Sequence, residues 1–567
     1  MRVLLLHPDD DFREVQEKIW DLIIDMGRAP AATYRRWEAQ AGCGVCSLHD
    51  CAREIDDLYG VRQVLQPGFG AIVDRHGIDW WDILVPELLP NTLSLMLVER
   101  QARQFGNDCD LYTTRPSWIA NALAARLGAK LRMAGSSWWA RRLRYSRLLT
   151  HLDGRQLAQL LEDKLRTNRF VRKFSGDPRP VILLPSAYVN GSRTAIDLAE
   201  RLPQHEFLLM NTRSSGKISS LPANVRMNAL RVDSSLSGSE MTELLDRWES
   251  LKAKLTVQFE EFTFANSVGA FDQVPALLRD GILMRDAWMR VFESANVTGV
   301  VCTDDSNPPT RIPLILAQVR GLPTVVCHHG ALDYLMAVKS FCADSYIAKS
   351  NLERDYLERV CRLPPEKILE LPTASEKTSD PVDHSSGDCL VFFSEPYEGK
   401  YWRADEISAE LIPQLISLAT DLRLKLIFKI HPFESVKAHR RRLQRFAGDD
   451  AKNVEIIAGP AADELFRRTR IAITAQSTTA LECARRNIPV FLCAWLRDAY
   501  SGYVAQFTRF GVGHPLALAA QIAEIPKLLD CPPERQVSFD EQSQSDGLDR
   551  LSDRFATRDS SEVATAC

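Results

Sequence analysis

The sequence lacks several features that would each indicate a particular class of protein. No apolar run approaches the ~18 residues that a membrane-spanning helix needs, and the start has no secretory signal pattern. Neither sign of charge dominates, because 70 basic and 74 acidic residues leave a net charge of −4, which argues against a surface dedicated to nucleic acid. No repeat of about 20–50 residues is evident, which argues against a solenoid. We therefore expect a cytoplasmic globular protein that does not bind nucleic acid.

Separated pairs of metal ligands are also missing. The 13 cysteines are scattered and odd in number, as is typical of reduced core residues in a cytosolic protein. One compact group, Cys43, Cys46, His49 and Cys51, contains competent zinc ligands, but structural zinc sites usually combine two separated pairs. We favour a partly buried loop over a metal site here, and we expect neither a metal nor a cofactor in the protein.

Strand and helix patterns do alternate along most of the chain. Its 567 residues, 45% hydrophobic and 25% charged, leave room for two or three domains. Alternation of this kind predicts the α/β class, with parallel sheets covered by helices. The predicted strands are residues 3–6, 110–114, 180–185, 206–210, 297–302, 324–330, 344–348, 389–393, 424–430, 471–475 and 488–492.

The pattern divides the chain into two α/β domains. We predict an N-terminal domain over residues 1–372, with helical insertions at about 136–175 and 237–295, and a C-terminal domain over 388–530. Residues 373–387 are rich in Ser, Asp, Thr and Pro and resemble a linker. Residues 531–567 contain few apolar side chains, so we expect a disordered, mobile tail. The segment beginning Trp80-Trp81 is interpreted as core.

Two strand patterns in the second domain end abruptly in polar groups. One runs from Leu424 to His431-Pro432, and the other from Ile471 to Gln476-Ser-Thr-Thr479, where a helix pattern starts at once. Strand, polar turn and helix N-terminus together favour an anion. Because ligands of open α/β sheets bind beyond the carboxyl ends of strands, the two ends predict one diphosphate site. That indicates a nucleotide-activated donor.

These motifs carry a family resemblance over about residues 297–515. His431-Pro432, Gln476 to Thr479, His328 to Asp333 and Lys349 to Tyr356 resemble bacterial GT-B glycosyltransferases of surface-polysaccharide synthesis. The most similar kinds are capsule sialyl- and Kdo-transferases and CDP-glycerol glycerophosphotransferases. The resemblance implies two Rossmann-like domains facing across a cleft, with the nucleotide sugar mainly on the C-terminal domain and no metal. It also implies a Ser/Thr pair at Ser477-Thr478.

Donor binding needs groups that stabilise a departing phosphate. His431 and the hydroxyls after the second strand supply such groups, and Lys429 would add positive charge on the same strand face. Glu482, one turn into the helix, either accepts a ribose hydroxyl or caps the helix, and simple capping explains only one of the three hydroxyls. The predicted donor-binding residues are Lys429, His431, Pro432, Gln476, Ser477, Thr478, Thr479, Glu482 and Glu395.

The acceptor hydroxyl must lose a proton, and a His or carboxylate of the facing domain would take it. We choose His329, which precedes Gly330 at a strand end and resembles the His-Gly of the glycerophosphotransferases. His328 would point the other way if the strand pleat continues, so it is interpreted as structural. Asp304, with Asp305, is the alternative catalytic residue, although a helix-capping turn also explains this pair.

A basic segment offers a further partner. Residues 141–173 contain ten lysines and arginines against three acids, which suits contact with anionic lipid at the inner membrane, although an amphipathic helix packed on the domain is the preferred interpretation. The predicted function is transfer of a sugar, or a polyol phosphate, to a glycan or lipid-linked acceptor. The alternatives are a UDP-sugar epimerase on the same scaffold and a non-catalytic nucleotide- or polysaccharide-binding protein.

Overall fold

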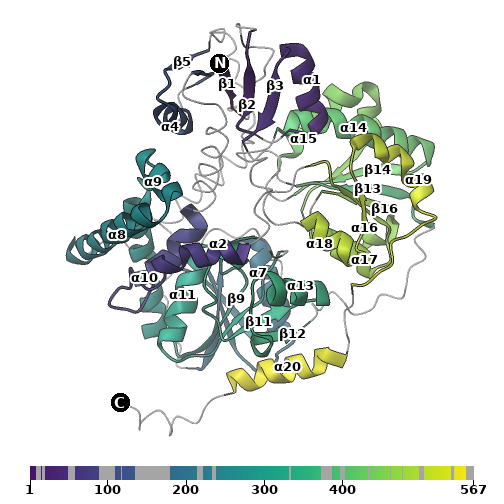
Figure 1. Cartoon of the computed structure of the whole chain (residues 1–567). Coiled ribbons are helices and arrows are strands. Elements are labelled where there is room, and N and C mark those ends of the chain that lie inside the picture. Colours follow the sequence, from purple (N-terminus) through teal and green to yellow (C-terminus); the bar gives the residue numbers. More distant parts are fainter. Residues whose placement is uncertain are drawn as a thin grey trace, which may run out of the picture.

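The computed structural model describes most of the chain. The described residues are 1–7, 10, 15, 19–27, 29–48, 58–88, 109–115, 118–134, 179–212, 221–232, 238–330, 332, 334–371, 386–395, 403–431, 434–459, 461–475, 477–496, 503–537 and 542–556. They form parallel sheets packed against helices, so the predicted α/β class with Rossmann-like layers is confirmed. Figure 1 shows three lobes, one for each sheet.

A five-stranded sheet at the N-terminus corrects the predicted domain division, which placed residues 1–372 in one domain. β1 pairs with β2 and β4, at Val3↔Leu22 and Val3↔Leu111, and within the described part of the chain it pairs with no strand after β4. The apolar strand β1 therefore lies inside a separate sheet, between the short strands β2 and β4. The order is β3-β2-β1-β4-β5, and the elements are β1 Arg2–Leu6, β2 Leu22–Asp25, α1 Ala31–Ala41, β3 Gly44–Ser47, β4 Asp110–Thr113, α4 Trp118–Leu127 and β5 Leu131–Met133.

A seven-stranded sheet forms the second lobe and contains the remaining strands predicted for the N-terminal domain. Its order is β12-β11-β10-β9-β6-β7-β8. Every residue of β6 is buried, as expected for an apolar run covered on both faces of a parallel sheet. The strands are β6 Val181–Ser186, β7 Phe207–Asn211, β8 Val225–Ala229, β9 Val297–Cys302, β10 Thr324–Val326, β11 Ser345–Ala348 and β12 Ile368–Glu370.

Helices cover this second sheet. The insertion predicted at 237–295 consists of α8, α9 and α10, whereas the one predicted at 136–175 lies outside the described residues. The elements are α2 Leu58–Leu65, η3 Gln66–Gly68, α7 Val189–Glu200, α8 Gly238–Gln258, α9 Glu260–Ser267, α10 Val274–Ser294, α11 Pro308–Val319, α12 Tyr334–Val338, α13 Asn351–Asp355, the π-helical turn η4 Tyr356–Val360 and η5 Pro365–Lys367.

Residues 58–88 belong to this second lobe, although β4 of the first lobe follows them in the chain. Trp80 and Trp81 are buried in its core, as predicted. Nearby, the fully buried Arg285 of α10 pairs with Asp74, its Nη1 lying 2.7 Å from Oδ2. The chain therefore visits the second lobe before it completes the first.

A six-stranded sheet forms the third lobe and corresponds to the predicted C-terminal domain. Its order is β15-β14-β13-β16-β17-β18, with all pairs parallel. The elements are β13 Cys389–Phe393, α14 Ala404–Asp421, β14 Lys425–Lys429, α15 Val436–Ala447, η8 Gly448–Asn453, β15 Glu455–Ile457, α16 Asp463–Arg468, β16 Thr469–Thr474, α17 Thr479–Arg485, β17 Val490–Cys493, α18 Tyr503–Arg509, β18 His514–Leu516, η9 Ala519–Glu524 and α19 Ile525–Leu528.

The second and third lobes meet beside the carboxyl ends of their strands. Arg485, at the end of α17, donates from Nη2 to the carbonyl oxygen of Lys349, which directly follows β11 (3.1 Å). Arg509 of α18 pairs with Asp355 of α13 at 3.0 Å, and Figure 1 places these helices next to each other. We call the carboxyl ends of these two sheets the facing edges.

The first lobe docks on the third through one buried charge pair. Arg403, directly before α14, is 1% exposed and pairs with Asp25 at the end of β2, with 2.7 Å between Nη2 and Oδ1. The same guanidinium donates to the carbonyl oxygens of Asp10 and His7 and lies over the Trp37 ring. This contact fixes the carboxyl end of the first sheet against α14.

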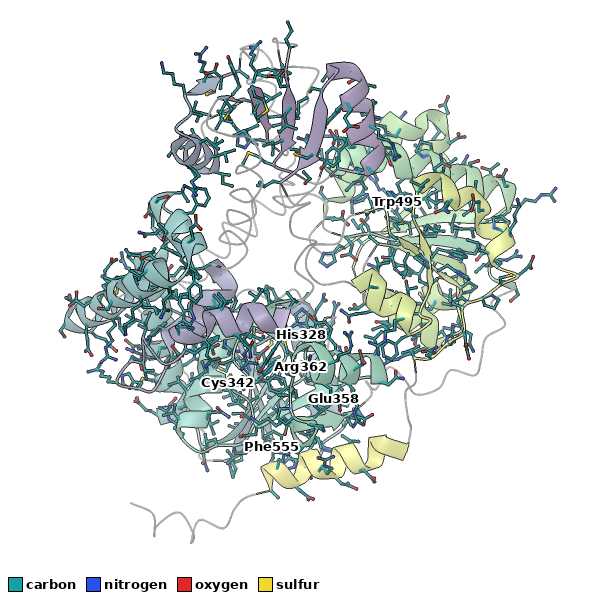
Figure 2. The ribbon with its side chains drawn as sticks, in the orientation of Figure 1. His328, Cys342, Glu358, Arg362, Trp495 and Phe555 are labelled. Atoms are coloured by element: carbon teal, nitrogen blue, oxygen red, sulfur yellow. The ribbon has the colours of Figure 1, made fainter. Side chains whose placement is uncertain are left out.

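Part of the predicted mobile tail is ordered, which corrects that prediction. Gln542–Phe555 forms α20, which leaves the third lobe and packs on the second. Leu551 and Phe555 are buried, and Phe555 lies against Gly299 of β9 (Figure 2). The reason is amphipathicity, because Leu548, Leu551 and Phe555, spaced three and four residues apart, give an otherwise polar helix one apolar stripe.

Candidate functional site

Asp304 and His328 form an ion pair at the facing edge of the second lobe. They follow β9 and β10, which are neighbours, so the pair bridges two strand ends. His328 Nε2 lies 3.7 Å from Asp304 Oδ1, and Asp304 also accepts from the Ser306 amide and the Asn307 side chain. Burial opposes charge on both groups, but their attraction prevails: it raises the pKa of His328 and lowers that of Asp304. Asp304 is thus held as a carboxylate.

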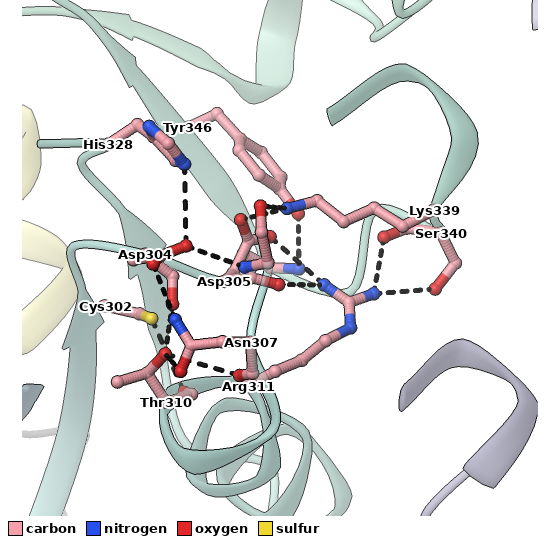
Figure 3. A network of polar contacts seen from close by, with 12 residues as sticks. Cys302, Asp304, Asp305, Asn307, Thr310, Arg311, His328, Lys339, Ser340 and Tyr346 are labelled. Carbon is pink, nitrogen blue, oxygen red and sulfur yellow. Dashed lines mark hydrogen bonds and ion pairs between the residues drawn. The ribbon is translucent and has the colours of Figure 1, made fainter. Parts of the chain in front are cut away.

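A second buried network supports this pair from behind (Figure 3). Asp305 contacts Lys339 Nζ and lies 3.2 Å from Arg311 Nη1, and Arg311 also pairs with Asp82. All four charged groups are almost wholly inaccessible to solvent. The charges of the two carboxylates and the two cations balance. Both backbone groups of Ser340 are also hydrogen-bonded: its amide donates to Asp82, and its carbonyl oxygen accepts from Arg311. The network therefore holds the ends of β9 and α12 in one arrangement.

His329 is held in one tautomer. Its Nδ1 lies 3.0 Å from the carbonyl oxygen of Thr303, which can only accept, so Nδ1 carries the proton. Its Nε2 is then the basic atom. Burial, followed by the charge of His328, lowers the pKa of His329 to about 4. At neutral pH the ring is therefore uncharged and can accept a hydrogen bond.

The prediction that His328 points away from His329 is wrong. The two rings are stacked, with centroids 5.4 Å apart and planes 16° apart. β10 ends at Val326, so the alternation of a strand no longer applies two residues later. The His328 backbone carbonyl accepts from Lys349 Nζ at 2.8 Å, which fixes this turn to the end of β11.

The first turn of α7 completes this side of the site. The Tyr188 ring, directly before α7, lies 6.0 Å from the His329 ring. Gly191 approaches Thr303 so closely that a Cβ there would lie 2.8 Å from the Thr303 hydroxyl. Only glycine allows this packing. The same turn presents Arg193, which is exposed, toward the third lobe.

Lys429 ends β14 on the opposite facing edge and is 7% exposed. Its ammonium donates to the carbonyl oxygen of Ile430 at 3.0 Å, and among the described residues no carboxylate lies within ion-pairing distance. Burial and then Arg193 lower the pKa of Lys429, against a weaker opposite effect of Glu434. A buried ammonium has three donors and normally a counter-charge, so two donors remain for another acceptor.

His431 follows on the same strand end. Its amide donates to Glu434 Oε2 at 3.0 Å, and the other oxygen of that carboxylate lies 3.0 Å from His439 Nε2. Burial lowers the pKa of His431, so its ring is mainly neutral at pH 7. Pro432, the other half of the predicted motif, lies outside the described residues.

The predicted hydroxyl cluster divides into two parts. Ser477 Oγ lies 3.0 Å from Thr479 Oγ1 and accepts from the Thr479 amide, so these two residues close the start of α17. Thr478 makes no side-chain hydrogen bond within the described part of the chain. Its hydroxyl is the one of the three that the helix start does not use. Gln476 lies outside the described residues.

Two predicted carboxylates lie on the same edge. Glu482 is in α17, and burial raises its pKa even though 43% of its side chain is exposed; the charges of Arg486 and Arg485 act in the opposite direction. Lys349 of the second lobe is also close enough to influence it electrostatically. Glu395 follows β13, the strand between β14 and β16. Adjacent strand ends thus bring together Lys429, Glu395 and Ser477.

Sequence reasoning missed the residues that hold the second-lobe edge in place. Asp82, Arg311 and Lys339 were not predicted, and neither was Arg193. Each of the first three is a single charge within an apolar stretch, which was the available signal for a buried partner. Of the compact group of possible zinc ligands, His49 and Cys51 lie outside the described residues, within which no group of three His, Cys, Asp or Glu side chains is placed to hold a metal.

Comparison with known proteins finds distant likenesses only. No family model and no curated protein matches the chain. Among solved structures, CalG4, the calicheamicin glycosyltransferase, matches with a TM-score of 0.37 and 11% identity over 68% of this chain and 98% of its own. The UDP-GlcNAc 2-epimerase of Methanocaldococcus jannaschii, in complex with UDP-GlcNAc and UDP, has a TM-score of 0.40 and 12% identity over 66% and 98%. The spinosyn rhamnosyltransferase SpnG with thymidine diphosphate has 0.36 and 13% over 67% and 96%. Likenesses this distant leave the chemistry to be argued from the side chains.

Proposed function

We propose that the protein is a GT-B-type glycosyltransferase, which moves a sugar or a polyol phosphate from a nucleotide-activated donor to an acceptor hydroxyl. The observation that carries this proposal is Lys429, a buried ammonium with no carboxylate partner among the described residues. It lies at a parallel-sheet carboxyl edge, where such folds bind ligands. A donor diphosphate would supply the missing negative charge, with further hydrogen bonds from His431 and Thr478.

The opposite edge supplies the acceptor side of the reaction. The acceptor hydroxyl gives its proton to His329 Nε2 as its oxygen bonds to the anomeric carbon. The bond from that carbon to the diphosphate breaks, and the departing charge is stabilised by Lys429 and the neighbouring donors. Asp304 acts as a positioning residue through His328. A pKa of about 4 is low for a general base, but a bound diphosphate would raise it, because negative charge favours the protonated ring.

The cellular role follows from the acceptor. We propose that the acceptor is a glycan or lipid-linked glycan of a bacterial surface polysaccharide, extended on the cytoplasmic face of the inner membrane. The basic segment 141–173, which lies outside the described residues, is the proposed membrane contact. Among the described residues, no helix combines the length and apolarity needed to cross a bilayer.

A ligand screen with matched variants tests the donor site. Thermal unfolding of the purified chain is followed with CMP, CDP, UDP, GDP, dTDP and their sugar conjugates. A ligand at a hundred times its Kd adds about 2.7 kcal/mol of stability. We expect one nucleotide to raise the Tm of the wild type and of Lys425→Met, but not of Lys429→Met. Lys425 begins the same strand, is exposed and pairs with Glu455, so it is a control for loss of charge.

The nucleotide sugar identified by this screen then distinguishes glycosyl transfer from the two alternative functions. A radiolabelled donor is incubated with and without lipid-linked glycan, and the products are identified. Label in the acceptor supports the transferase, whereas an isomerised nucleotide sugar without acceptor indicates the epimerase. Binding without either product indicates a non-catalytic protein, and absence of binding by the folded wild type contradicts the donor site itself.

A further inference from the structure

A polar cavity lies in the second lobe, away from the facing edges. It has a volume of about 280 Å³ and is lined by residues of α2, the segment before β11 and the segment before β12. Phe341 and Lys367 precede β11 and β12 respectively, so the cavity lies toward the amino ends of these strands. His328 and Lys349 lie at the carboxyl ends of the same sheet. The two sites are therefore separated by the length of the strands.

The charge of this cavity is strongly one-sided. Arg62, Arg362 and Lys367 line it, together with Tyr59, Gln63 and Phe341, and no carboxylate is among its described lining residues. Arg62 lies over the Phe341 ring at 5.0 Å, which orients its guanidinium. Within the described residues, none of the three cations has an ion-pair partner. Three like charges around one concavity repel each other, and a bound anion would remove that repulsion.

The hydrogen-bond donors that line the cavity indicate which class of anion it would bind. A guanidinium binds phosphate oxygens through two parallel hydrogen bonds, and lysine adds a compact positive charge. Tyr59 and Gln63 add neutral donors at the rim. Two guanidinium groups and one ammonium match a doubly charged phosphate better than a single carboxylate. The volume lies just below the ~300–1,000 Å³ typical of pockets for drug-sized ligands, which favours a small ligand over a nucleotide sugar.

We propose that this cavity binds a phosphate monoester, independently of the donor site at the facing edges. The ester can come from a small soluble metabolite or from the headgroup of a lipid, since both present the same terminal phosphate. The Arg62, Arg362 and Lys367 side chains hold its oxygens.

Arg423 provides a matched control for Arg362. Both arginines are exposed, follow a helical segment and adopt the left-handed backbone conformation, each with φ 55°. Arg362 lines the cavity, whereas Arg423 lies at the end of α14 in the third lobe. Figure 2 shows Arg362 in the second lobe, far from Trp495 of the third lobe. Replacing either by Gln removes one charge from the same backbone geometry.

Titration calorimetry with glycerol 3-phosphate, at fixed ionic strength, tests the proposal on the full chain. We expect saturable binding that weakens about tenfold or more in Arg362→Gln and in Lys367→Gln, because each loses a charged hydrogen bond. Arg423→Gln and Lys429→Met should bind as the wild type does. Equal weakening in Arg423→Gln would overturn the proposal as non-specific attraction, and loss in Lys429→Met would place the binding at the donor site.

Vesicles identify the source of the phosphate. The protein is sedimented with phosphatidylcholine vesicles, with and without phosphatidic acid, whose headgroup is a phosphate monoester. Binding that requires phosphatidic acid and is lost in Arg362→Gln supports a lipid source, whereas soluble binding alone supports a metabolite. If the wild type binds neither glycerol 3-phosphate nor phosphatidic acid, the cavity is no phosphate site.

Discussion

The two facing edges hold their charges in opposite ways. On the second lobe, fully buried Asp305 contacts both Lys339 and Arg311, which are also fully buried, and Asp304 pairs with His328. On the third lobe, buried Lys429 has a backbone carbonyl as its acceptor, and Thr478 has no side-chain hydrogen bond within the described residues. The first edge pairs its charges internally, although neither ring nitrogen of His328 has a hydrogen-bond partner within the described residues. The second edge leaves donors for another molecule.

This difference separates scaffold from binding surface. A buried network whose members are all paired is costly to disturb and has one arrangement. A buried cation without a counter-charge is destabilising by itself, and it becomes favourable only when an anion arrives. We infer that the second-lobe edge positions the base and that the third-lobe edge binds the charged donor.

The largest expected effect comes from breaking the paired network. In Asp82→Ala, Arg311 loses one of its two carboxylates inside the core, and we expect the free energy of unfolding to fall by about 3–5 kcal/mol. Urea unfolding at pH 7 measures it. Glu243→Ala is the control, because its partner Arg247 is exposed and the pair should contribute less than ~1 kcal/mol. Equal small losses in both variants would contradict a scaffold role for the network.

The next effect concerns catalysis and leaves the scaffold intact. In His329→Gln the general base is absent, so we expect kcat to fall about 10²–10⁴-fold while the Kd for the donor nucleotide hardly changes. In the wild type, kcat/KM should rise with pH through the free-enzyme pKa of about 4 and then level off. His205→Gln, beside α20, is the control and should keep wild-type kcat. An unchanged kcat in His329→Gln would move the role of base to another residue.

The sequence predicted most inner strands of the sheets but not their borders, and it also missed the inner strand β2. All six edge strands were missed: β3, β5, β8, β12, β15 and β18. All six are three to five residues long, and most are partly exposed; in β8, for example, only Val225 is fully buried. The predicted central strands are apolar runs such as β13, in which every residue is buried. Burial on both faces leaves a continuous apolar signal, and an edge strand lacks it.

The residues of the candidate site were likewise predicted only in part. His329, Lys429 and the hydroxyls lie at strand ends or within a few residues after them, so local sequence places each at the carboxyl edge of its sheet. The network around Asp305 includes one distant segment, since Asp82, the other partner of Arg311, lies 229 residues before it. A lone charge in an apolar run indicates that a partner exists but does not identify it. The docking of the first lobe by Arg403 and Asp25, 378 residues apart, was unpredictable for the same reason.

A smaller effect separates the hydroxyls that close α17 from the one proposed to bind ligand. Ser477→Ala loses the acceptor for the Thr479 amide, so we expect about 0.5–1.5 kcal/mol of lost stability. Thr478→Val keeps the shape and breaks no hydrogen bond among the described residues. It should leave the Tm unchanged but weaken nucleotide binding a few-fold. Nucleotide affinity unaffected by Thr478→Val would remove that residue from the donor site.

The smallest effect is a pH dependence that belongs to the paired edge alone. Burial opposes charge on His328, but Asp304 raises its pKa above the ordinary 6.5, with a smaller contribution from Asp305 and opposition from Lys339. The folded protein then binds this proton more tightly than the unfolded chain. The resulting stability is complete below pH 6.5 and is lost as the pH rises through the folded pKa.

His205, His329 and His431 have lowered pKa values, so their contributions change only below pH 6.5. Buried cysteines with raised pKa values, such as Cys302 and Cys327, also reduce stability as the pH rises towards 8.5, but they do so equally in the wild type and in a His328 variant. Urea unfolding at pH 6.5 and pH 8.5 should show the wild type losing stability across this window. His328→Gln should be less stable than the wild type at pH 6.5 and should lose less stability than the wild type between pH 6.5 and pH 8.5. If the wild type and the variant lose stability in parallel, His328 is not charged in the folded protein, and the second-lobe edge then holds a neutral imidazole beside Asp304 where we infer an ion pair.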